Sequence, residues 1–163
     1  MFVLIRTLTY ATLFIAFVLI YVPSRVLAWA GVARPAVMGW PQIGGLIICS
    51  LGAIIALSCV FAFAFIGKGT PAPFDPPRRL VIRGPYRFVR NPMYLGVATA
   101  LAGAALFYTS TALLAFVALF LVVTHLFVLL YEEPTLHRSF GPEYEVYCHS
   151  VHRWLPSMSG HAR

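Results

Sequence analysis

Residues 43–66 read IGGLIICSLGAIIALSCVFAFAFI and contain no charged side chain. About 20 apolar helical residues cross the hydrocarbon of a bilayer, so this stretch predicts a transmembrane helix. The rest of the chain fits that interpretation: of 163 residues, 60% are hydrophobic and 10% are charged, and the mean hydropathy is +0.83. Soluble domains carry about 25% charged residues. The composition therefore indicates an integral membrane protein whose main partner is the lipid bilayer.

Three further apolar stretches predict spans of the same kind. They cover residues 8–22, 93–108 and 111–131. Pro23 follows the first stretch and should end it, because proline disrupts a helix interior. Gly96 and Gly103 in the third-span stretch lack side chains and leave room for a neighbouring helix to pack closely. The sequence thus predicts an all-α fold with four transmembrane helices.

The short link between the last two stretches, Tyr108-Thr109-Ser110, forces them into a hairpin. Six of the 12 Lys and Arg residues lie together between the second and third spans: Lys68, Arg78, Arg79, Arg83, Arg87 and Arg90. Cytoplasmic loops are enriched in such residues. We therefore expect this loop, and with four spans both termini, in the cytoplasm. The net charge of +7 is then explained by anionic lipid, and no nucleic-acid partner is expected.

The composition changes after Tyr131. Four of the five acidic residues follow it: Glu132, Glu133, Glu143 and Glu145. Apolar residues recur there at three- and four-residue spacing, as on one face of a helix: Leu136, Phe140, Tyr144, Tyr147 and Val151. Gly141-Pro142 interrupts the pattern, and proline is favoured in a first helical turn. We therefore expect two short amphipathic helices at the cytoplasmic interface, the second opening at Pro142.

The hairpin brings the basic loop and the glutamates to the same rim of the protein. A cleft at that rim would offer arginines on one side and carboxylates on the other, above apolar helices. Such a cleft suits a ligand that carries both charges and an oily second substrate that arrives from the membrane. Cys49, Cys59 and Cys148 have no metal-binding spacing, so free thiols and no metal site are expected.

Two motifs resemble a known superfamily. RRLVIRGPYRFVRNPMYLG at residues 78–96, followed by EEPTLHRSFGPEYEVY at 132–147, is similar to the isoprenylcysteine carboxyl methyltransferase and phospholipid methyltransferase superfamily. The resemblance extends over residues 68–156. It implies an integral membrane enzyme that uses S-adenosyl-L-methionine, of the type found in the bacterial cytoplasmic membrane. Together with the spans expected from hydropathy, it predicts a single membrane domain, 1–163, made of two spans (1–66), a cytoplasmic cofactor loop (67–92), a helical hairpin (93–131) and cytoplasmic helices (132–163).

The resemblance also implies a cofactor site. Its residues would be Arg78, Arg79, Leu80, Val81, Tyr86, Asn91, Pro92, Met93, Tyr94, Glu132 and Glu133. Glu132 can pair with the α-ammonium of the cofactor, while loop amides and basic side chains hold its carboxylate and ribose. Tyr86 and Tyr94 can wall the adenine or the sulfonium, since aromatic faces attract cations.

Two departures from the superfamily concern the acceptor. The prenylcysteine members have histidine where this chain has Asn91, and an arginine that holds the substrate carboxylate where this chain has Val128. These differences argue against a literal prenylcysteine substrate.

Methyl transfer depends mainly on orientation, but an amine acceptor must also lose a proton. The candidate base is His125, seven residues before Glu132 on nearly the same helix face, with Arg90 as a second candidate catalytic residue. The alternative for His125 is a hydrogen-bonded histidine that packs two helices.

Two classes of function therefore follow from the sequence. The first is methyl transfer from S-adenosyl-L-methionine to a lipophilic or small acceptor at the membrane interface. The acceptor is a carboxylate or thiol if the chain is isoprenylcysteine carboxyl methyltransferase-like, and an amine if it is a phosphatidylethanolamine-type N-methyltransferase. The second is a non-catalytic membrane subunit that binds lipid or a partner through the basic loop.

Overall fold

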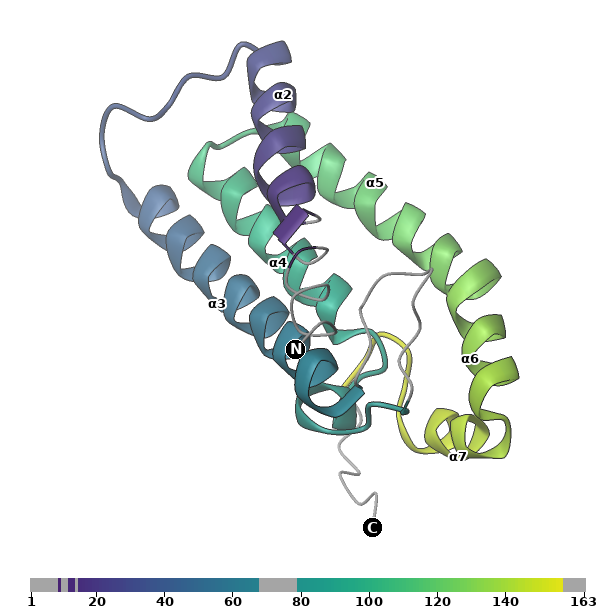
Figure 1. Cartoon of the computed structure of the whole chain (residues 1–163). Coiled ribbons are helices and arrows are strands. Elements are labelled where there is room, and N and C mark those ends of the chain that lie inside the picture. The colour runs from purple at the N-terminus through teal and green to yellow at the C-terminus, as the bar shows by residue number, and fades with distance from the viewer. Residues whose placement is uncertain (1–8, 10–11, 14, 68–78, 157–163) are drawn as a thin grey trace.

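The computed structural model describes residues 9, 12–13, 15–67 and 79–156, and these residues contain helices but no strand. The longer helices are α2 (Val22–Trp29), α3 (Trp40–Ala62), α4 (Pro92–Phe107), α5 (Thr111–Phe127), α6 (Glu133–Phe140) and α7 (Pro142–Ser150). Wider π-helical turns cover Ala16–Tyr21, Phe63–Gly67 and Val128–Glu132, and a short 3-10 helix covers Gly84–Arg87. Figure 1 shows α2 to α5 as a bundle, with α6 and α7 beyond one end of it.

Helices α3 and α4 are antiparallel and pack backbone to backbone through glycines. A Cβ atom added to Gly52 would lie 2.3 Å from the backbone nitrogen of Ala100, and one added to Gly103 would lie 2.3 Å from that of Cys49. Both distances are far shorter than any real Cβ contact. The prediction of close packing at Gly96 and Gly103 is therefore correct, and this contact fixes the position of α4, which carries much of the site described below.

The hairpin between α4 and α5 forms as predicted. Ser110 caps α5, since its hydroxyl accepts a hydrogen bond of 3.3 Å from the backbone N–H of Leu113. Thr109 adopts a left-handed conformation with φ of 47°. The buried residues between α3, α4 and α5 include Ala56, Val97, Leu101, Val117 and Phe120. This core holds the hairpin of α4 and α5 against α3.

Two of the expected helix ends differ from the structure. Pro23 does not end the first helix, which continues from the π-helical turn Ala16–Tyr21 through α2 to Trp29. Likewise α5 continues through the π-helical turn Val128–Glu132 into α6, although Pro134 lies near the start of α6. Proline lacks the N–H that an α-helix needs, and a local widening of the helix accommodates such a loss. The helix containing the glutamates is therefore continuous with the predicted fourth span.

Two helices in the described part of the chain are long and apolar enough to cross a membrane. They are Trp40–Ala62 and the continuous helix Thr111–Phe140. Ala16–Trp29 and Pro92–Phe107 are apolar but shorter; at 1.5 Å per residue, 16 residues extend about 24 Å, less than the ~30 Å of bilayer hydrocarbon. Two of the four expected spans are thus supported, and the other two stay predictions.

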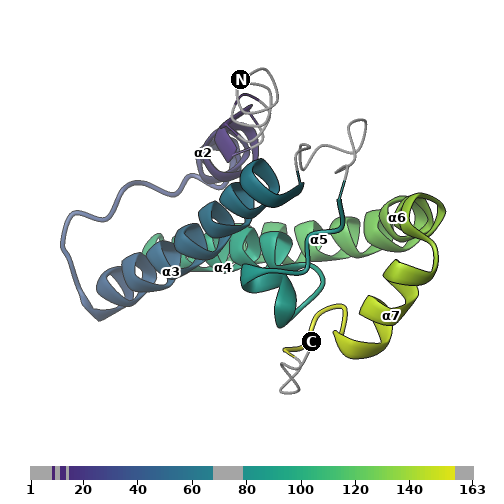
Figure 2. The same cartoon turned by 60° about the horizontal axis from the view of Figure 1, so that its bottom comes forward.

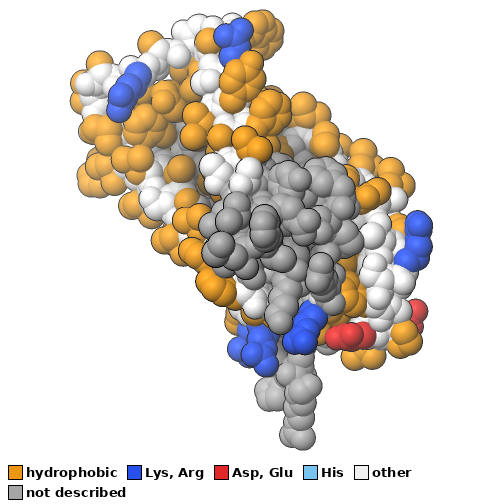
Figure 3. All heavy atoms as spheres, viewed as in Figure 1, with side chains coloured by type: hydrophobic (Ala, Val, Ile, Leu, Met, Phe, Trp, Pro, Cys, Tyr) orange, Lys and Arg blue, Asp and Glu red, His pale blue; other side chains and the backbone are white. Residues whose placement is uncertain are grey.

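The surface agrees with a membrane location. Figure 3 shows hydrophobic side chains over much of the described surface in that view, with acidic ones at its lower rim near basic ones. Large apolar side chains point outwards from the long helices, among them Leu51, Ile54, Phe61, Leu119, Val122 and Val123. Water does not favour such a surface, whereas lipid tails do. The three cysteines are free thiols, of which Cys59 is buried.

Helices α6 and α7 lie where the two short helices were predicted, with Gly141 between them at φ of 49°, although α6 continues the α5 helix. Figure 2 shows α7 turning back from α6 towards the bundle. Tyr144, Tyr147 and Val151 form a buried cluster with Leu80 and with residues of α6 packed against it. The segment after α7, residues 151–154, is called the C-terminal strap below. It lies against the loop that precedes α4.

Candidate active site

A cavity lies where the loop before α4 meets the end of the α5 helix. It is small, with a cavity volume of about 20 Å³. Its lining residues come from four helical elements and the loop before α4: Phe63, Tyr86, Arg90, Asn91, Met93, Tyr94 and Glu132. Five of these were predicted as cofactor-binding residues and Arg90 as a catalytic one. The two motifs therefore meet at one cavity, as the hairpin topology predicts.

The contact between Tyr94 and Glu132 joins the two motifs directly. The hydroxyl of Tyr94 donates a hydrogen bond of 2.9 Å to Oε2 of Glu132, across 38 positions of sequence. Tyr94 lies in the first turn of α4, and Glu132 ends the π-helical turn before α6. In the described part of the chain no Lys or Arg forms an ion pair with Glu132. The carboxylate thus retains capacity for a positively charged group.

Tyr86 forms an aromatic wall of the cavity. The 3-10 helix Gly84–Arg87 places it there, entered through Gly84 at φ of 63°, a conformation that glycine adopts without strain. The edge of one ring faces the other between Tyr86 and Phe63, with centroids 5.4 Å apart. Burial, and then the neighbouring Cys59 and Glu132, raise the pKa of Tyr86 well above its usual range. Tyr86 is therefore a neutral phenol at physiological pH.

Arg90 reaches the cavity from the loop before α4. Its Nη1 donates to Sγ of Cys148 at 2.7 Å and lies 3.2 Å from Oε1 of Glu133. Its backbone N–H donates to the carbonyl of His152 at 2.9 Å. Its Nε is buried and has no hydrogen-bond partner among the described residues. A residue in the cavity wall therefore keeps an unused donor.

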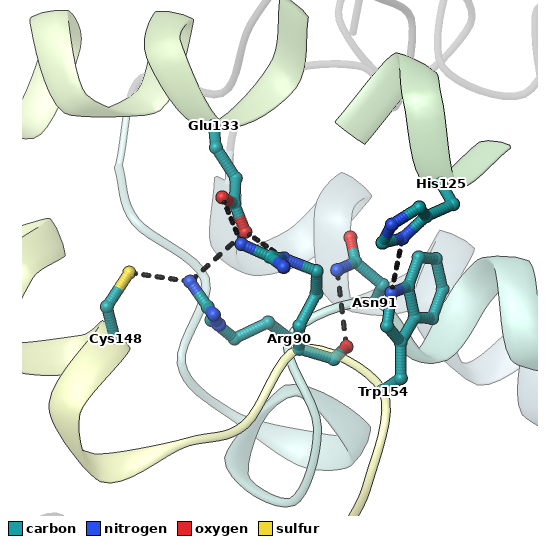
Figure 4. Close-up of polar contacts among 7 residues, drawn as sticks. Arg90, Asn91, His125, Glu133, Cys148 and Trp154 are labelled. Atoms are coloured by element: carbon teal, nitrogen blue, oxygen red, sulfur yellow. Dashed lines mark hydrogen bonds and ion pairs between the residues drawn. The ribbon is translucent and has the colours of Figure 1, made fainter. Parts of the chain in front are cut away.

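Glu133 does not line the cavity, unlike its neighbour Glu132. It forms a paired ion contact with Arg153, whose Nε and Nη2 donate to its two oxygens at 2.7 and 2.8 Å (Figure 4). That hydrogen bond raises the pKa of Arg153. The prediction that Glu133 binds cofactor has no support in this geometry; the residue joins the helix to the C-terminal strap and to Arg90.

His125 also lies outside the cavity lining. Its Nδ1 accepts a hydrogen bond of 3.0 Å from Nε1 of Trp154 in the strap (Figure 4). A neutral imidazole has one acceptor nitrogen, and here that nitrogen is already used. The arrangement fits the alternative interpretation of His125, a histidine that joins two segments, better than a base that acts in the cavity.

The remaining predicted residues are distributed around the cavity. Val81 is buried beside Tyr86, and Leu80 packs on the cluster formed with α7. Arg79 is exposed, and Arg78 lies outside the described residues. Pro92 is buried in the first turn of α4. The loop thus contributes apolar support at least as much as charge.

Sequence reasoning missed the strap and one wall of the cavity. Arg153, Trp154 and Cys148 all bond to predicted site residues, and Asn91 Nδ2 donates to the carbonyl of Arg153 at 3.3 Å. The sequence feature that could have indicated the strap is the pair Arg153-Trp154, a charged and an aromatic residue side by side in a polar C-terminal segment. Phe63 gave no signal, because it lies within an unbroken apolar run.

A comparison with protein families tests the resemblance of the two motifs. The model of the phospholipid methyltransferase family matches residues 40–143. The chain belongs to this family. The match begins at α3 and contains every residue that lines the cavity. No curated protein and no solved structure matches the chain.

Membership of the phospholipid methyltransferase family points to a membrane methyltransferase. The matched region ends before the C-terminal strap, so Arg153 and Trp154 are outside it. Their contacts with Asn91, His125 and Glu133 are known from the structure of this chain alone.

Proposed function

We propose that this protein transfers a methyl group from S-adenosyl-L-methionine to a lipophilic acceptor at the membrane surface where the cavity opens. The observation that carries the proposal is the contact of Tyr94 with Glu132, which joins the two motifs of a methyltransferase family at one cavity. By the distribution of basic residues that surface is the cytoplasmic face of a multi-pass protein.

The side chains that line the cavity have the chemistry to bind such a cofactor, although the cavity must widen to admit it. Glu132 is a partly buried carboxylate without a cationic partner in the described chain, and suits an ammonium group. Arg90 has a buried Nε–H that is free to donate a hydrogen bond to an oxygen of the cofactor. Tyr86, Tyr94 and Phe63 offer aromatic surface, which attracts a sulfonium or stacks on a base. When bound, the cofactor supplies a methyl group on a positively charged sulfur.

The chain's own residues have to orient and shield the reacting groups. Holding donor and acceptor in line supplies a large share of the rate of a displacement reaction. Tyr94 fixes the carboxylate of Glu132, and the strap fixes the loop that carries Arg90 and Asn91. Neutral Tyr86 adds no negative charge that would compete for the cofactor's cation.

The acceptor we favour is an amine of a phospholipid head group. The position at which prenylcysteine enzymes have a carboxylate-binding arginine is Val128, which is fully buried here. Arg153 is paired with Glu133, and the free N–H of Arg90 is assigned above to the cofactor, so neither arginine is left over for an acceptor carboxylate. The family match to phospholipid methyltransferases supports the same choice.

Cofactor binding tests the first part of the proposal. S-adenosylhomocysteine, the product form of the cofactor, should raise the melting temperature of the protein purified in detergent, because a ligand that binds the folded state stabilises it. Glu132→Ala should abolish the rise. Glu143→Ala, which removes an exposed carboxylate from α7, is the matched control and should keep it. A wild-type protein that does not respond would favour the non-catalytic lipid-binding alternative.

Methyl-labelled cofactor tests the acceptor. Membranes that contain the protein should transfer label to the lipid fraction, and a methyl group on nitrogen survives mild base. A methyl ester is hydrolysed by mild base and releases volatile methanol. Base-labile label would identify a carboxylate acceptor and overturn the choice of an amine.

A further inference from the structure

Glu133 is shared unequally between two arginines. Arg153 holds both of its oxygens, at 2.7 and 2.8 Å, whereas Arg90 makes a single longer contact of 3.2 Å to Oε1. The Arg153 contact has the parallel, two-pronged geometry that makes arginine–carboxylate pairs strong. Arg90 therefore contacts Glu133 through one nitrogen and does not form a two-pronged pair with it.

The position of Arg153 does not depend on Glu133 alone. The strap is anchored by backbone and side-chain bonds at three consecutive residues. The carbonyl of His152 accepts from Arg90 N–H, the carbonyl of Arg153 accepts from Asn91, and Trp154 donates to His125. These bonds deliver the guanidinium of Arg153 to Glu133.

Removal of Arg153 would leave Oε2 of Glu133 free and Oε1 with its single contact to Arg90. A carboxylate in that position favours a two-pronged contact with the nearest guanidinium, and one of the two edges that a guanidinium offers for such a contact includes Nε. Arg90 Nε, buried and without a partner in the described structure, is the donor that a contact through this edge would consume.

We propose that Arg153 is a positioning residue for Arg90: by occupying Glu133, it keeps the Nε–H of Arg90 free to bind a carboxylate oxygen of the cofactor. The inference rests on the proposed function, since it needs a cofactor with an amino-acid moiety in the cavity. Arg90 and Glu132 then form the two poles of the site, one for the carboxylate and one for the ammonium. Arg153 touches neither the cofactor nor the acceptor.

The test compares the affinities of two ligands by calorimetry in detergent. S-adenosylhomocysteine has the amino-acid moiety, and 5′-methylthioadenosine lacks it. Arg153→Gln should weaken S-adenosylhomocysteine about tenfold, the order of one hydrogen bond to a charged group. The affinity of 5′-methylthioadenosine should not change. Arg138→Gln, which removes an exposed arginine from α6, is the matched control.

The double variant Glu133→Gln/Arg153→Gln distinguishes two roles of Arg153: keeping Arg90 free of Glu133, or only holding the strap in place. Without its charge, residue 133 no longer captures Arg90, so the affinity for S-adenosylhomocysteine should recover most of the loss. A simple structural brace gives the opposite result, with the double variant as weak as Arg153→Gln or weaker. Arg153→Lys, which keeps the charge but not the two-pronged contact, should lie between wild type and Arg153→Gln, and it tests the inference if the glutamine variant misfolds.

The outcomes distinguish the two levels of the argument. A wild-type protein that binds neither ligand overturns the proposed function and this inference with it. A wild-type protein that binds S-adenosylhomocysteine, with Arg153→Gln equally tight or equally impaired for both ligands, leaves the proposed function standing and overturns the role of Arg153.

Discussion

At the scale of single residues, Tyr94 fixes the orientation of the Glu132 carboxylate, because its hydroxyl donates a hydrogen bond to Oε2. In Tyr94→Phe the carboxylate would lose that donor while remaining partly buried. Leaving a buried polar group without its partner lowers the free energy of unfolding by about 1–3 kcal/mol. We expect a lower melting temperature and an affinity for S-adenosylhomocysteine reduced several-fold, because the carboxylate loses its fixed orientation. Calorimetry and thermal unfolding measure both effects.

Tyr108→Phe provides the control for Tyr94→Phe. Tyr108 lies at the opposite end of α4, next to the hairpin turn, and removing its hydroxyl should not change ligand affinity. Equal affinities for wild type and Tyr94→Phe would show that the contact with Glu132 does not serve the site.

The pair His125 and Trp154 makes a second residue-scale prediction. If their hydrogen bond secures the strap, His125→Ala and Trp154→Phe should lower the melting temperature, and the double variant should lower it by less than the sum, because both changes remove one contact. If His125 acts as a base, His125→Ala stops turnover of an amine acceptor while Trp154→Phe does not. Melting and turnover measured on the same three variants decide between these roles.

The residues of the site were only partly predictable. The sequence places Glu132 and Glu133 together, but neighbours on a helix point about 100° apart, so one faces the cavity and the other faces the strap. Which one does so depends on the rotation of the helix, and the π-helical turn at Val128–Glu132 alters that rotation. Arg153 meets Glu133 only because the chain reverses at Gly141, a tertiary feature that no local pattern specifies.

At the scale of elements, the close contact of α3 with α4 makes the next prediction. Gly52→Ala would place a Cβ 2.3 Å from the backbone of Ala100, so the helices must separate. Overpacking of this kind typically costs about 1–3 kcal/mol. We expect a lower melting temperature in detergent and weaker binding of S-adenosylhomocysteine, since α4 carries Tyr94.

Gly44→Ala is the matched control for Gly52→Ala. Its Cβ would lie 3.6 Å from a methyl group of Leu106, which is ordinary contact, so stability should be unchanged or slightly higher. Equal melting temperatures for the two variants would mean that the helices are free to move apart without loss.

Helix positions were more predictable than helix ends. The centres of α3, α4 and α5 follow from hydropathy, because about 20 apolar residues have few alternatives in a bilayer. The expected end at Pro23 was wrong, and so was the expectation of a separate helix after Tyr131, because a π-helical turn precedes each proline-containing helix. A turn that gains one residue leaves the composition unchanged, so hydropathy does not detect it.

At the scale of the whole molecule, the structure places the cavity and the hairpin turn at opposite ends of α4. The side chain of Gln42 bonds to the carbonyl of Phe107 at 3.1 Å, so the start of α3 lies at the turn end as well. If the long helices cross the bilayer, the loop before α4 and the turn at Thr109 lie on opposite sides of it. This arrangement is what the positive-inside rule predicts.

Cysteine labelling in sealed vesicles tests that topology. Arg83→Cys and Thr109→Cys both replace exposed residues, one in the basic loop and one in the hairpin turn. A membrane-impermeant maleimide should label Arg83→Cys in inside-out vesicles and Thr109→Cys in right-side-out vesicles. The wild-type protein, with its free Cys49, Cys59 and Cys148, sets the background. Labelling of both variants from one side would mean that α4, with its 16 residues, does not cross the membrane, and the cavity would then lie within a structure that only rests on the bilayer.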